Sequence, residues 1–258
     1  MSMVFSERQG AIAILTLNNP NRYNALGGSI LRDLSEALDA ALGESSIRAI
    51  VLTGAGKGFC SGAQFGGDTL DRGEEIGSLM RMGLNPLLEK MRASLKPIVV
   101  AVNGPAAGAG VGIALAGDIV IAARSARFIL SFVRLGAALD AGTSLFLQRS
   151  IGSARARALA LLGEPLSAET AAQWGLIWKV VEDDELLDHA LALAQKLADG
   201  PPVSIGLIKK QIESAWTAPL PSALDDEASS QARAFVTEDL REGAAAWVQK
   251  RPPHFTGR

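Results

Sequence analysis

Apolar residues recur along this chain with two different periods, and the alternation between them predicts strands separated by helices. Short apolar or alternating runs predict strands at 4–9, 11–17, 49–53, 97–102, 119–122 and 177–181. Apolar residues at helical spacing predict helices at 29–43, 80–93, 142–151, 153–162 and 167–174. Strands that alternate with helices favour parallel pairing through right-handed crossovers, so we expect an α/β fold.

The pattern changes near residue 184, because only helical spacing is found beyond it. It predicts helices at 184–199, 202–216, 222–235 and 237–249. We therefore expect an α/β core over 1–195 and a helical C-terminal region over 196–258. Nothing repeats with the period of 20 to 50 residues that is typical of solenoid proteins.

Composition and charge exclude several classes of function. A net charge of −2 gives no electrostatic case for a nucleic acid or an anionic membrane surface as partner. The single cysteine, Cys60, excludes an intrachain disulfide and a multi-cysteine zinc site, and we expect no metal. Only two histidines exist, His189 and His254, which argues against a histidine-based triad. With neither a signal peptide nor a membrane span apparent, a cytoplasmic enzyme that relies on carboxylates and backbone groups is the expectation.

Two glycine-rich stretches, 54–63 and 104–112, each follow an apolar strand. Neither has the spacing of a nucleotide-binding fingerprint, and tight turns alone could explain such glycines. Small residues also let a ligand approach the backbone, so one N–H group from each stretch could converge on a single carbonyl oxygen. A thioester suits such a site because its carbonyl accepts enolate charge readily. The second stretch enters a helix near Gly108, and the helix dipole would add to the field at that oxygen.

Asp140 lies in GAALDAGTS (136–144), among small and apolar neighbours. An aspartate ahead of a helical run can cap the helix by accepting backbone N–H groups. A carboxyl in an apolar setting can instead have a raised pKa and serve as a catalytic base. This stretch alone leaves both interpretations open.

Five segments together resemble one known family. They are LTLNNPNRYNAL (15–26), GKGFCSGAQF (56–65), KPIVVAVNGPAAGAGVGIALAGDIVIAA (96–123), ARALALLGEPLSAETAAQWGLIWKVVED (156–183) and EGAAAWVQKRPPHFTG (242–257). The chain resembles the enoyl-CoA hydratase/isomerase (crotonase) superfamily over nearly its whole length. Within that superfamily it is most similar to the acyl-CoA isomerases of phenylacetate pathways.

The resemblance implies a spiral of ββα units, with C-terminal helices that cover the active site and form homotrimers or dimers of trimers. It implies an acyl-CoA substrate and no separate cofactor, because coenzyme A is part of the substrate. The implied oxyanion donors are the backbone N–H groups of Cys60 and Ala109. The residues that the resemblance places along coenzyme A are Arg22, Asn24, Ala25, Leu26, Ala63 and Phe65, with Lys250 and Phe255 facing a nucleotide bound mainly by a neighbouring subunit.

Departures from the family pattern bear on the reaction. The two glutamates with which hydratases of this family activate water are replaced by Gly112 and Phe132, which would line the acyl pocket and cannot move a proton. Isomerases of the family place a single acid where Asp140 stands. The resemblance therefore implies double-bond isomerisation, with Asp140 as the proton shuttle. Gln64 stands where the family usually has aspartate, so loop hydrogen bonding and the substrate pocket can differ here.

Other functions remain open at this stage. Weak hydratase activity is one, and a non-catalytic protein that binds CoA esters is another. A related group of acyl-CoA dehalogenases uses the same aspartate position as a nucleophile, together with a histidine and a tryptophan. This chain has no histidine before position 189 and has Phe132 in the place of the tryptophan, which argues against dehalogenation.

Overall fold

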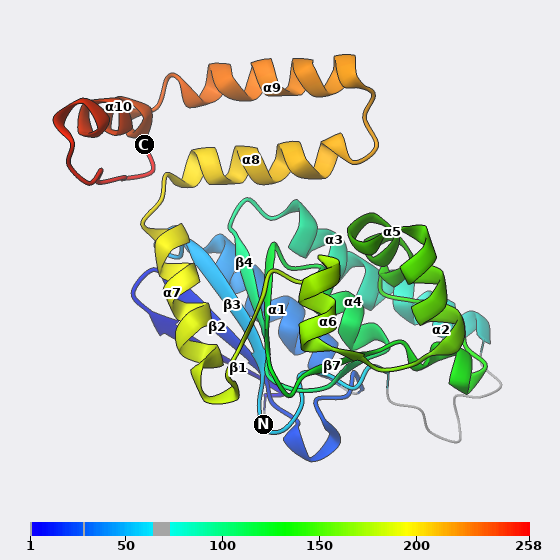
Figure 1. Cartoon of the computed structure of the whole chain (residues 1–258). Coiled ribbons are helices and arrows are strands. Elements are labelled where there is room, and N and C mark those ends of the chain that lie inside the picture. Colours follow the sequence, from blue (N-terminus) through cyan, green and yellow to red (C-terminus); the bar gives the residue numbers. More distant parts are fainter. Residues whose placement is uncertain (1, 28, 64–72) are drawn as a thin grey trace.

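A computed structural model describes residues 2–27, 29–63 and 73–258 (Figure 1). Its larger sheet has the strand order β1-β2-β3-β4-β6-β9, in which β1 is antiparallel to β2 and all other pairs are parallel. These strands are β1 (Val4–Gln9), β2 (Ile12–Leu17), β3 (Ala49–Gly54), β4 (Ile98–Val102), β6 (Ile119–Ala123) and β9 (Lys179–Val181). The smaller sheet joins β5 (Ala106–Ala107), β7 (Arg127–Ile129) and β8 (Leu166–Ser167). The predicted α/β core with parallel pairing is confirmed.

Helices connect and cover these strands. In the core they are α1 (Ile30–Gly43), α2 (Gly73–Leu79), a π-helical turn (Met80–Leu84), α3 (Asn85–Ala93), α4 (Ala109–Leu115), α5 (Thr143–Leu162), α6 (Ala168–Trp174) and α7 (Leu186–Ala198). Short 3-10 helices occupy Pro20–Arg22, Ser131–Leu135 and Asp183–Glu185. The C-terminal helices are α8 (Pro202–Ala215), α9 (Leu220–Ala234) and α10 (Glu238–Gln249).

The sheet and its helices bury matching apolar faces. Every residue of β4 is buried, as expected for a central parallel strand with both faces covered. Helix α1 buries Ile30, Leu34, Leu38 and Ala41, which share one face at helical spacing. Helix α7 packs on β2, β3, β4 and β6 through a face built mostly of alanines, and these small side chains allow a close approach to the sheet.

One predicted helix is interrupted in the structure, and one predicted break between helices is confirmed. The segment predicted as one helix over 80–93 contains the π-helical turn, followed by α3, which has Pro86 in its first turn. Proline has no N–H group to donate to the preceding turn, so the regular hydrogen-bond ladder is interrupted there. The two helices predicted at 142–151 and 153–162 are separated only by Gly152, whose φ of +77° breaks an otherwise continuous α5. Strands β5, β7 and β8 have two or three residues each, too few to give a periodic signal.

The C-terminal helices project from the core (Figure 1). Helices α8 and α9 pack against each other, and α9 buries none of its residues within the chain. Lys209 of α8 connects this region to the core, because its ammonium is 2.8 Å from a carboxylate oxygen of Asp118 and both side chains are largely buried. The predicted boundary between 195 and 196 falls inside α7, and the turn at 199–201 divides the two parts instead.

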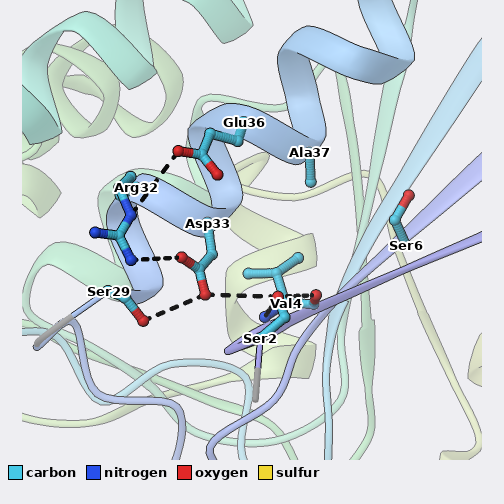
Figure 2. Close-up of a pocket in the computed structure, with 8 residues that line it drawn as sticks. All are labelled: Ser2, Val4, Ser6, Ser29, Arg32, Asp33, Glu36 and Ala37. Carbon is cyan, nitrogen blue, oxygen red and sulfur yellow. Dashed lines mark hydrogen bonds and ion pairs between the residues drawn. The ribbon is translucent and has the colours of Figure 1, made fainter.

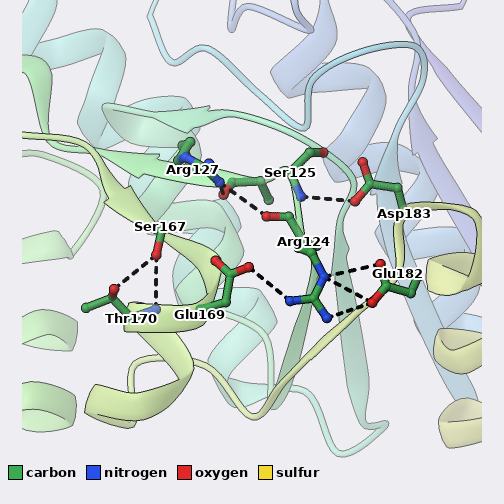
Figure 3. A network of polar contacts seen from close by, with 9 residues as sticks. Arg124, Ser125, Arg127, Ser167, Glu169, Thr170, Glu182 and Asp183 are labelled. Atoms are coloured by element: carbon green, nitrogen blue, oxygen red, sulfur yellow. Dashed lines mark hydrogen bonds and ion pairs between the residues drawn. The ribbon is translucent and has the colours of Figure 1, made fainter.

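Two surface features lie outside the glycine-rich stretches, an ion-pair network around Arg124 and a hollow beside Asp33. Figure 3 shows Arg124, at the end of β6, between Glu169 and Glu182, with nitrogen–oxygen distances of 3.2 and 2.6 Å. All three side chains are exposed, so water screens their charges and the network adds little to stability. A hollow of about 470 Å³ lies between β1 and α1, and Figure 2 shows Asp33 there, accepting a hydrogen bond from the hydroxyl of Ser29. Asp33 also accepts from the amide of Met3. Of the helices described, none combines the length and the apolar character that crossing a bilayer requires.

Candidate active site

The two glycine-rich stretches lie against each other. The amide of Ala107 donates to the carbonyl of Cys60 at 2.8 Å, and Cys60 forms an isolated parallel bridge with Ala106. A Cβ atom added to Gly110 would lie 2.2 Å from the Cys60 carbonyl oxygen, so only glycine permits this approach. A Cβ atom added to Gly62 would lie 3.2 Å from the amide nitrogen of Ala109. The stretches thus bring backbone groups of both loops together, as the oxyanion hypothesis requires.

The backbone amides of the first glycine-rich stretch differ in whether they already donate a hydrogen bond within the protein. Those of Phe59 and Cys60 both donate to the carbonyl of Pro105, at 3.1 and 3.3 Å, and that of Ser61 donates to Tyr23. The amide of Gly62 donates to the Cys60 thiol. The next amide, that of Ala63, donates to no acceptor among the residues that the structure describes.

The assignment of Cys60 as an oxyanion donor is therefore wrong. Its N–H group is directed into the protein at Pro105, and the residue is fully buried. Ala63, which sequence reasoning placed only along coenzyme A, is exposed and has the available amide. Ala109, at the first turn of α4, also donates to no acceptor in the described part of the chain. The amides of Ala63 and Ala109 are therefore the candidate donors to one ligand oxygen.

Asp140 is half-buried and lies immediately beyond these loops. Its Oδ1 is shielded from solvent, and among the described residues it is the only buried side-chain nitrogen or oxygen without a hydrogen-bond partner. Burial raises the pKa of the Asp140 carboxyl from its ordinary 3.8 to about 6. A carboxyl that is unpartnered, partly dry and titrating near neutrality is suited to accept and return a proton.

The helix-capping interpretation of Asp140 is not borne out. The N-cap residue of α5 is Gly142, and no side chain caps that helix. The main-chain carbonyl of Asp140 does accept two hydrogen bonds from Thr143, one from the amide at 3.0 Å and one from the hydroxyl at 2.7 Å. The backbone of Asp140 is thus fixed, while its carboxyl remains available for other chemistry.

Helix α4 holds the Asp140 turn against the second loop. A Cβ atom at Gly112 would lie 2.1 Å from the carbonyl oxygen and 2.4 Å from the Cβ of Ala141. Ala141 is itself buried, with a left-handed φ of +50°. Position 112 therefore has no room for any side chain, because the turn that carries Asp140 occupies that space.

Phe132 packs beside the same loops, from the 3-10 helix at Ser131–Leu135. Its ring is 3.8 Å from where a Cβ of Gly108 would be, and Gly108 has a left-handed φ of +52°. The roles predicted for Gly112 and Phe132 in an acyl pocket remain predictions. Gly112 nevertheless contacts Ala141, the neighbour of Asp140, and Phe132 lies beside Gly108, the neighbour of Ala109.

Asn24 has a structural role that its assignment to coenzyme A missed. It is fully buried, and its Oδ1 accepts from the amide of Asn19 at 2.8 Å. Its Nδ2 lies 2.8 to 3.1 Å from the carbonyls of Ala55, Gly58 and Phe59. Because every polar atom of this side chain is engaged within the protein, it holds the first glycine-rich stretch in shape and cannot contact a ligand.

The other residues assigned to coenzyme A have different exposures. Leu26 donates its amide to Gly62 at 2.7 Å and bridges Ala63, so Ala25 and Leu26 run beside the candidate oxyanion amides. Arg22 is exposed nearby. Gln64 and Phe65 lie outside the described residues. Lys250 is the C-cap residue of α10, which lies away from α5 in Figure 1, and Phe255 comes five residues later in the chain; the roles predicted for Lys250 and Phe255 remain predictions.

The thiol of Cys60 takes no part in this arrangement. Burial raises its pKa to about 12, and the nearby Asp140 charge acts in the same direction. A thiol that stays protonated and buried is a poor nucleophile. In the described part of the chain, no group of three or more His, Cys, Asp or Glu side chains is arranged to hold a metal ion.

Two amides without an acceptor in the described part of the chain and one carboxyl of raised pKa are the kinds of group that acid–base chemistry on a carbonyl compound requires. The chain belongs to the enoyl-CoA hydratase/isomerase family, whose model matches residues 7–258. It is 43% identical to the 1,2-epoxyphenylacetyl-CoA isomerase of Escherichia coli K12 and 36% identical to the 2,3-dehydroadipyl-CoA hydratase of the same strain, with both chains of each pair fully covered. The solved enoyl-CoA hydratase structure from Polaromonas sp. JS666 superposes with a TM-score of 0.94 at 35% identity, covering 98% of this chain and 99% of that one. The predicted crotonase-like fold is confirmed.

Proposed function

We propose that this protein is an acyl-CoA isomerase that moves a double bond from C3 to C2, with Asp140 as its single proton shuttle. The observation that carries the proposal is the Asp140 carboxyl, whose Oδ1 is shielded from water and unpartnered beside the second glycine-rich stretch. Its pKa near 6 leaves it mostly ionised at neutral pH, ready to act as a base.

The proposed reaction is a proton transfer between two carbons of the acyl chain. The amides of Ala63 and Ala109 bind the thioester oxygen and stabilise the negative charge that develops there, each by about 3 to 4 kcal/mol in the barrier. The Asp140 carboxylate takes a proton from C2, the double bond electrons shift, and the resulting acid returns the proton at C4. The step changes no oxidation state of the substrate, so the chain would need no redox cofactor.

Two positions favour isomerisation over hydration. Adding water needs a base for the water and an acid for the α-carbon. Gly112 supplies no side chain and could not hold one, because Ala141 lies within 2.4 Å of any Cβ atom at that position. Phe132 supplies an apolar ring. The similarity to the epoxyphenylacetyl-CoA isomerase supports the same choice and suggests a ring-derived acyl group as one substrate class.

A direct comparison of two substrates tests the proposed reaction. We expect turnover of a 3-enoyl-CoA, followed by the rise in absorbance of the conjugated product, and little loss of absorbance from crotonyl-CoA. Efficient hydration of crotonyl-CoA without isomerase activity would instead support a hydratase, as the similarity to the dehydroadipyl-CoA enzyme suggests. Binding of both esters with turnover of neither would support a non-catalytic protein.

The pH dependence of the reaction reports the protonation state of Asp140. Because the base must be ionised, kcat/KM for the 3-enoyl-CoA should rise with pH and level off above about 6, the raised pKa of this carboxyl. Initial rates between about pH 4.5 and 8 measure this, with stability checked at each pH. A level profile down to about pH 4.5 would mean that a carboxyl of ordinary pKa, or none, is the base.

We also propose that the protein assembles as a homotrimer or a dimer of trimers. Helix α9 buries no residue within the chain, and Leu220 (70% exposed) and Trp247 (86% exposed) on the C-terminal helices present apolar surface to solvent. In such an assembly Lys250 and Phe255 would face the nucleotide of a neighbouring subunit.

Light scattering coupled to gel filtration gives the mass of the assembly. We expect three or six times the chain mass of 26.9 kDa. Leu220→Asp, which places a charge on the exposed apolar face of α9, should lower that mass, whereas Glu227→Gln on the same helix should not. A monomeric wild-type protein would contradict this proposal.

A further inference from the structure

Thr143 is one of few polar residues that are buried in the described part of the chain, with no exposed surface at all. It is the first residue of α5, directly after the turn that carries Asp140. Its hydroxyl donates to the Asp140 carbonyl oxygen at 2.7 Å, and its amide donates to the same oxygen at 3.0 Å. Two donors of one residue thus hold a single backbone atom of the proposed base.

The turn between these residues is held in a conformation that it would not adopt freely. Ala141 has a φ of +50°, which costs about 1 to 2 kcal/mol for a residue with a Cβ atom. Gly142 follows with a φ of +71°, and the ring of Phe146 lies 2.8 Å from where its Cβ atom would be. A strained turn keeps its shape only where the surroundings hold it, and Thr143 supplies the two hydrogen bonds that close this one.

The hydroxyl of Thr143 does not serve as an ordinary helix cap. A capping hydroxyl accepts from an amide one turn further into the helix, as Ser167 does from Thr170 at the start of α6. The Thr143 hydroxyl instead points back, toward the residue whose carboxyl the mechanism uses. The hydroxyl therefore restrains the backbone of Asp140 rather than the first turn of α5.

We propose that Thr143 is a positioning residue, whose side-chain hydroxyl fixes the backbone of Asp140 so that the carboxyl faces the acyl carbons. The inference rests on the proposed function of Asp140. Loss of the hydroxyl would let the turn shift while leaving the oxyanion amides and the coenzyme A contacts in place. Misplacement of a catalytic group by about 1 Å can lower the rate by about a hundredfold.

The test compares Thr143→Val, which keeps the shape and removes the hydroxyl, with Thr143→Ser, which keeps the hydroxyl. For 3-enoyl-CoA isomerisation we expect the valine variant to lose about tenfold to a hundredfold in kcat with KM nearly unchanged. The serine variant should stay within about threefold of wild type. Should the valine variant fail to fold, Thr143→Ala provides the same comparison without added bulk, and the same loss in kcat is expected.

A matched control separates positioning from stability. Thr237, at the start of α10, donates its hydroxyl to the Ala234 carbonyl at 2.8 Å, the same kind of bond three residues back along the chain, and that hydroxyl also caps α10 by accepting from the Leu240 amide at 3.1 Å. Thr237→Val should lower the Tm while leaving kcat at the wild-type value. Wild-type kcat in Thr143→Val, or equal losses in the valine and serine variants, would overturn the role of the hydroxyl. Asp140→Asn is measured alongside, because isomerase activity in that variant would refute the proposed function itself, whatever Thr143 does.

Discussion

Asp140→Asn is expected to lower kcat for 3-enoyl-CoA isomerisation by about a thousandfold or more, with the affinity for acyl-CoA nearly unchanged. The asparagine side chain has the same shape but cannot take a proton from carbon, and a positioned acid–base group typically contributes about 10² to 10⁴ in rate. Because the proposed mechanism has one proton shuttle, nothing else in the described site can replace it. Steady-state kinetics and acyl-CoA binding by calorimetry measure the two effects separately.

Stability provides the internal control for this variant. The folded-state pKa of Asp140 is raised to about 6 from 3.8, so between these values the native protein binds more protons than the unfolded chain. The free energy of unfolding therefore falls as the pH rises through this window, and the ionised carboxyl destabilises the protein at pH 7. Asp140→Asn should have a Tm at pH 7 equal to or above that of wild type. An inactive variant with a much lower Tm would reflect misfolding, and an active one would remove Asp140 from the mechanism.

Gly112→Ala is expected to have the second largest effect. Its Cβ atom would lie 2.1 Å from the Ala141 carbonyl oxygen, a backbone atom that cannot rotate away. Overpacking of this kind costs about 1 to 3 kcal/mol in stability, and displacement of the Asp140 turn should lower kcat by about a hundredfold. Alanine is otherwise the better helix former by about 1 kcal/mol, so any loss comes from the contact. Chemical denaturation and kinetics of the purified variant measure both.

Gly43→Ala is the matched control for that substitution. Gly43 is the last residue of α1, and a Cβ atom there would meet nothing within 4 Å. This variant should keep the wild-type rate and equal or exceed the wild-type stability. If Gly112→Ala behaved in the same way, the contact between α4 and the Asp140 turn would not hold the site together.

The pattern of apolar residues predicts most of the architecture. Strand β4 is a continuous apolar run because both of its faces are buried, and helix α1 has apolar residues at helical spacing because it packs one face. The π-helical turn before α3 and the two-residue strands β5 and β8 could not be predicted, because they depend on tertiary contacts rather than on a local pattern. The sequence does not show that α7 packs on the sheet, because its helical spacing is like that of the C-terminal helices.

The sequence predicts the two loops and the acid of the candidate site. It does not predict which backbone atoms of the loops are available to a ligand. The sequence places two glycine-rich stretches after parallel strands, and parallel strands bring such loops to one edge of the sheet. It does not say which amide of a loop faces outward. The resemblance implies Cys60 as the donor, and the hydrogen bond to Pro105 that engages the Cys60 amide comes from a residue 45 positions away, so the local sequence does not reveal it.

The two interpretations of Asp140, helix capping and proton transfer, could likewise be distinguished only from the hydrogen bonds in the structure. Capping and proton transfer both place an aspartate before a helix, and they differ in whether the carboxyl oxygens are engaged. The buried, unpartnered Oδ1 decides between them. For Asn24, the resemblance implies a place along coenzyme A, whereas the hydrogen bonds of its side chain hold the first glycine-rich stretch in shape.

The proposed site places one carboxyl over the carbons next to a thioester whose oxygen is bound by two backbone amides. A crystal structure of Asp140→Asn with a bound 3-enoyl-CoA tests this arrangement most directly, because that variant should bind substrate without converting it. We expect the residue 140 side chain to lie about 3 to 3.5 Å from C2 and C4, with the thioester oxygen within hydrogen-bond distance of the Ala63 and Ala109 amides. Another ionisable side chain closer to those carbons, or a thioester oxygen directed away from both amides, would contradict it.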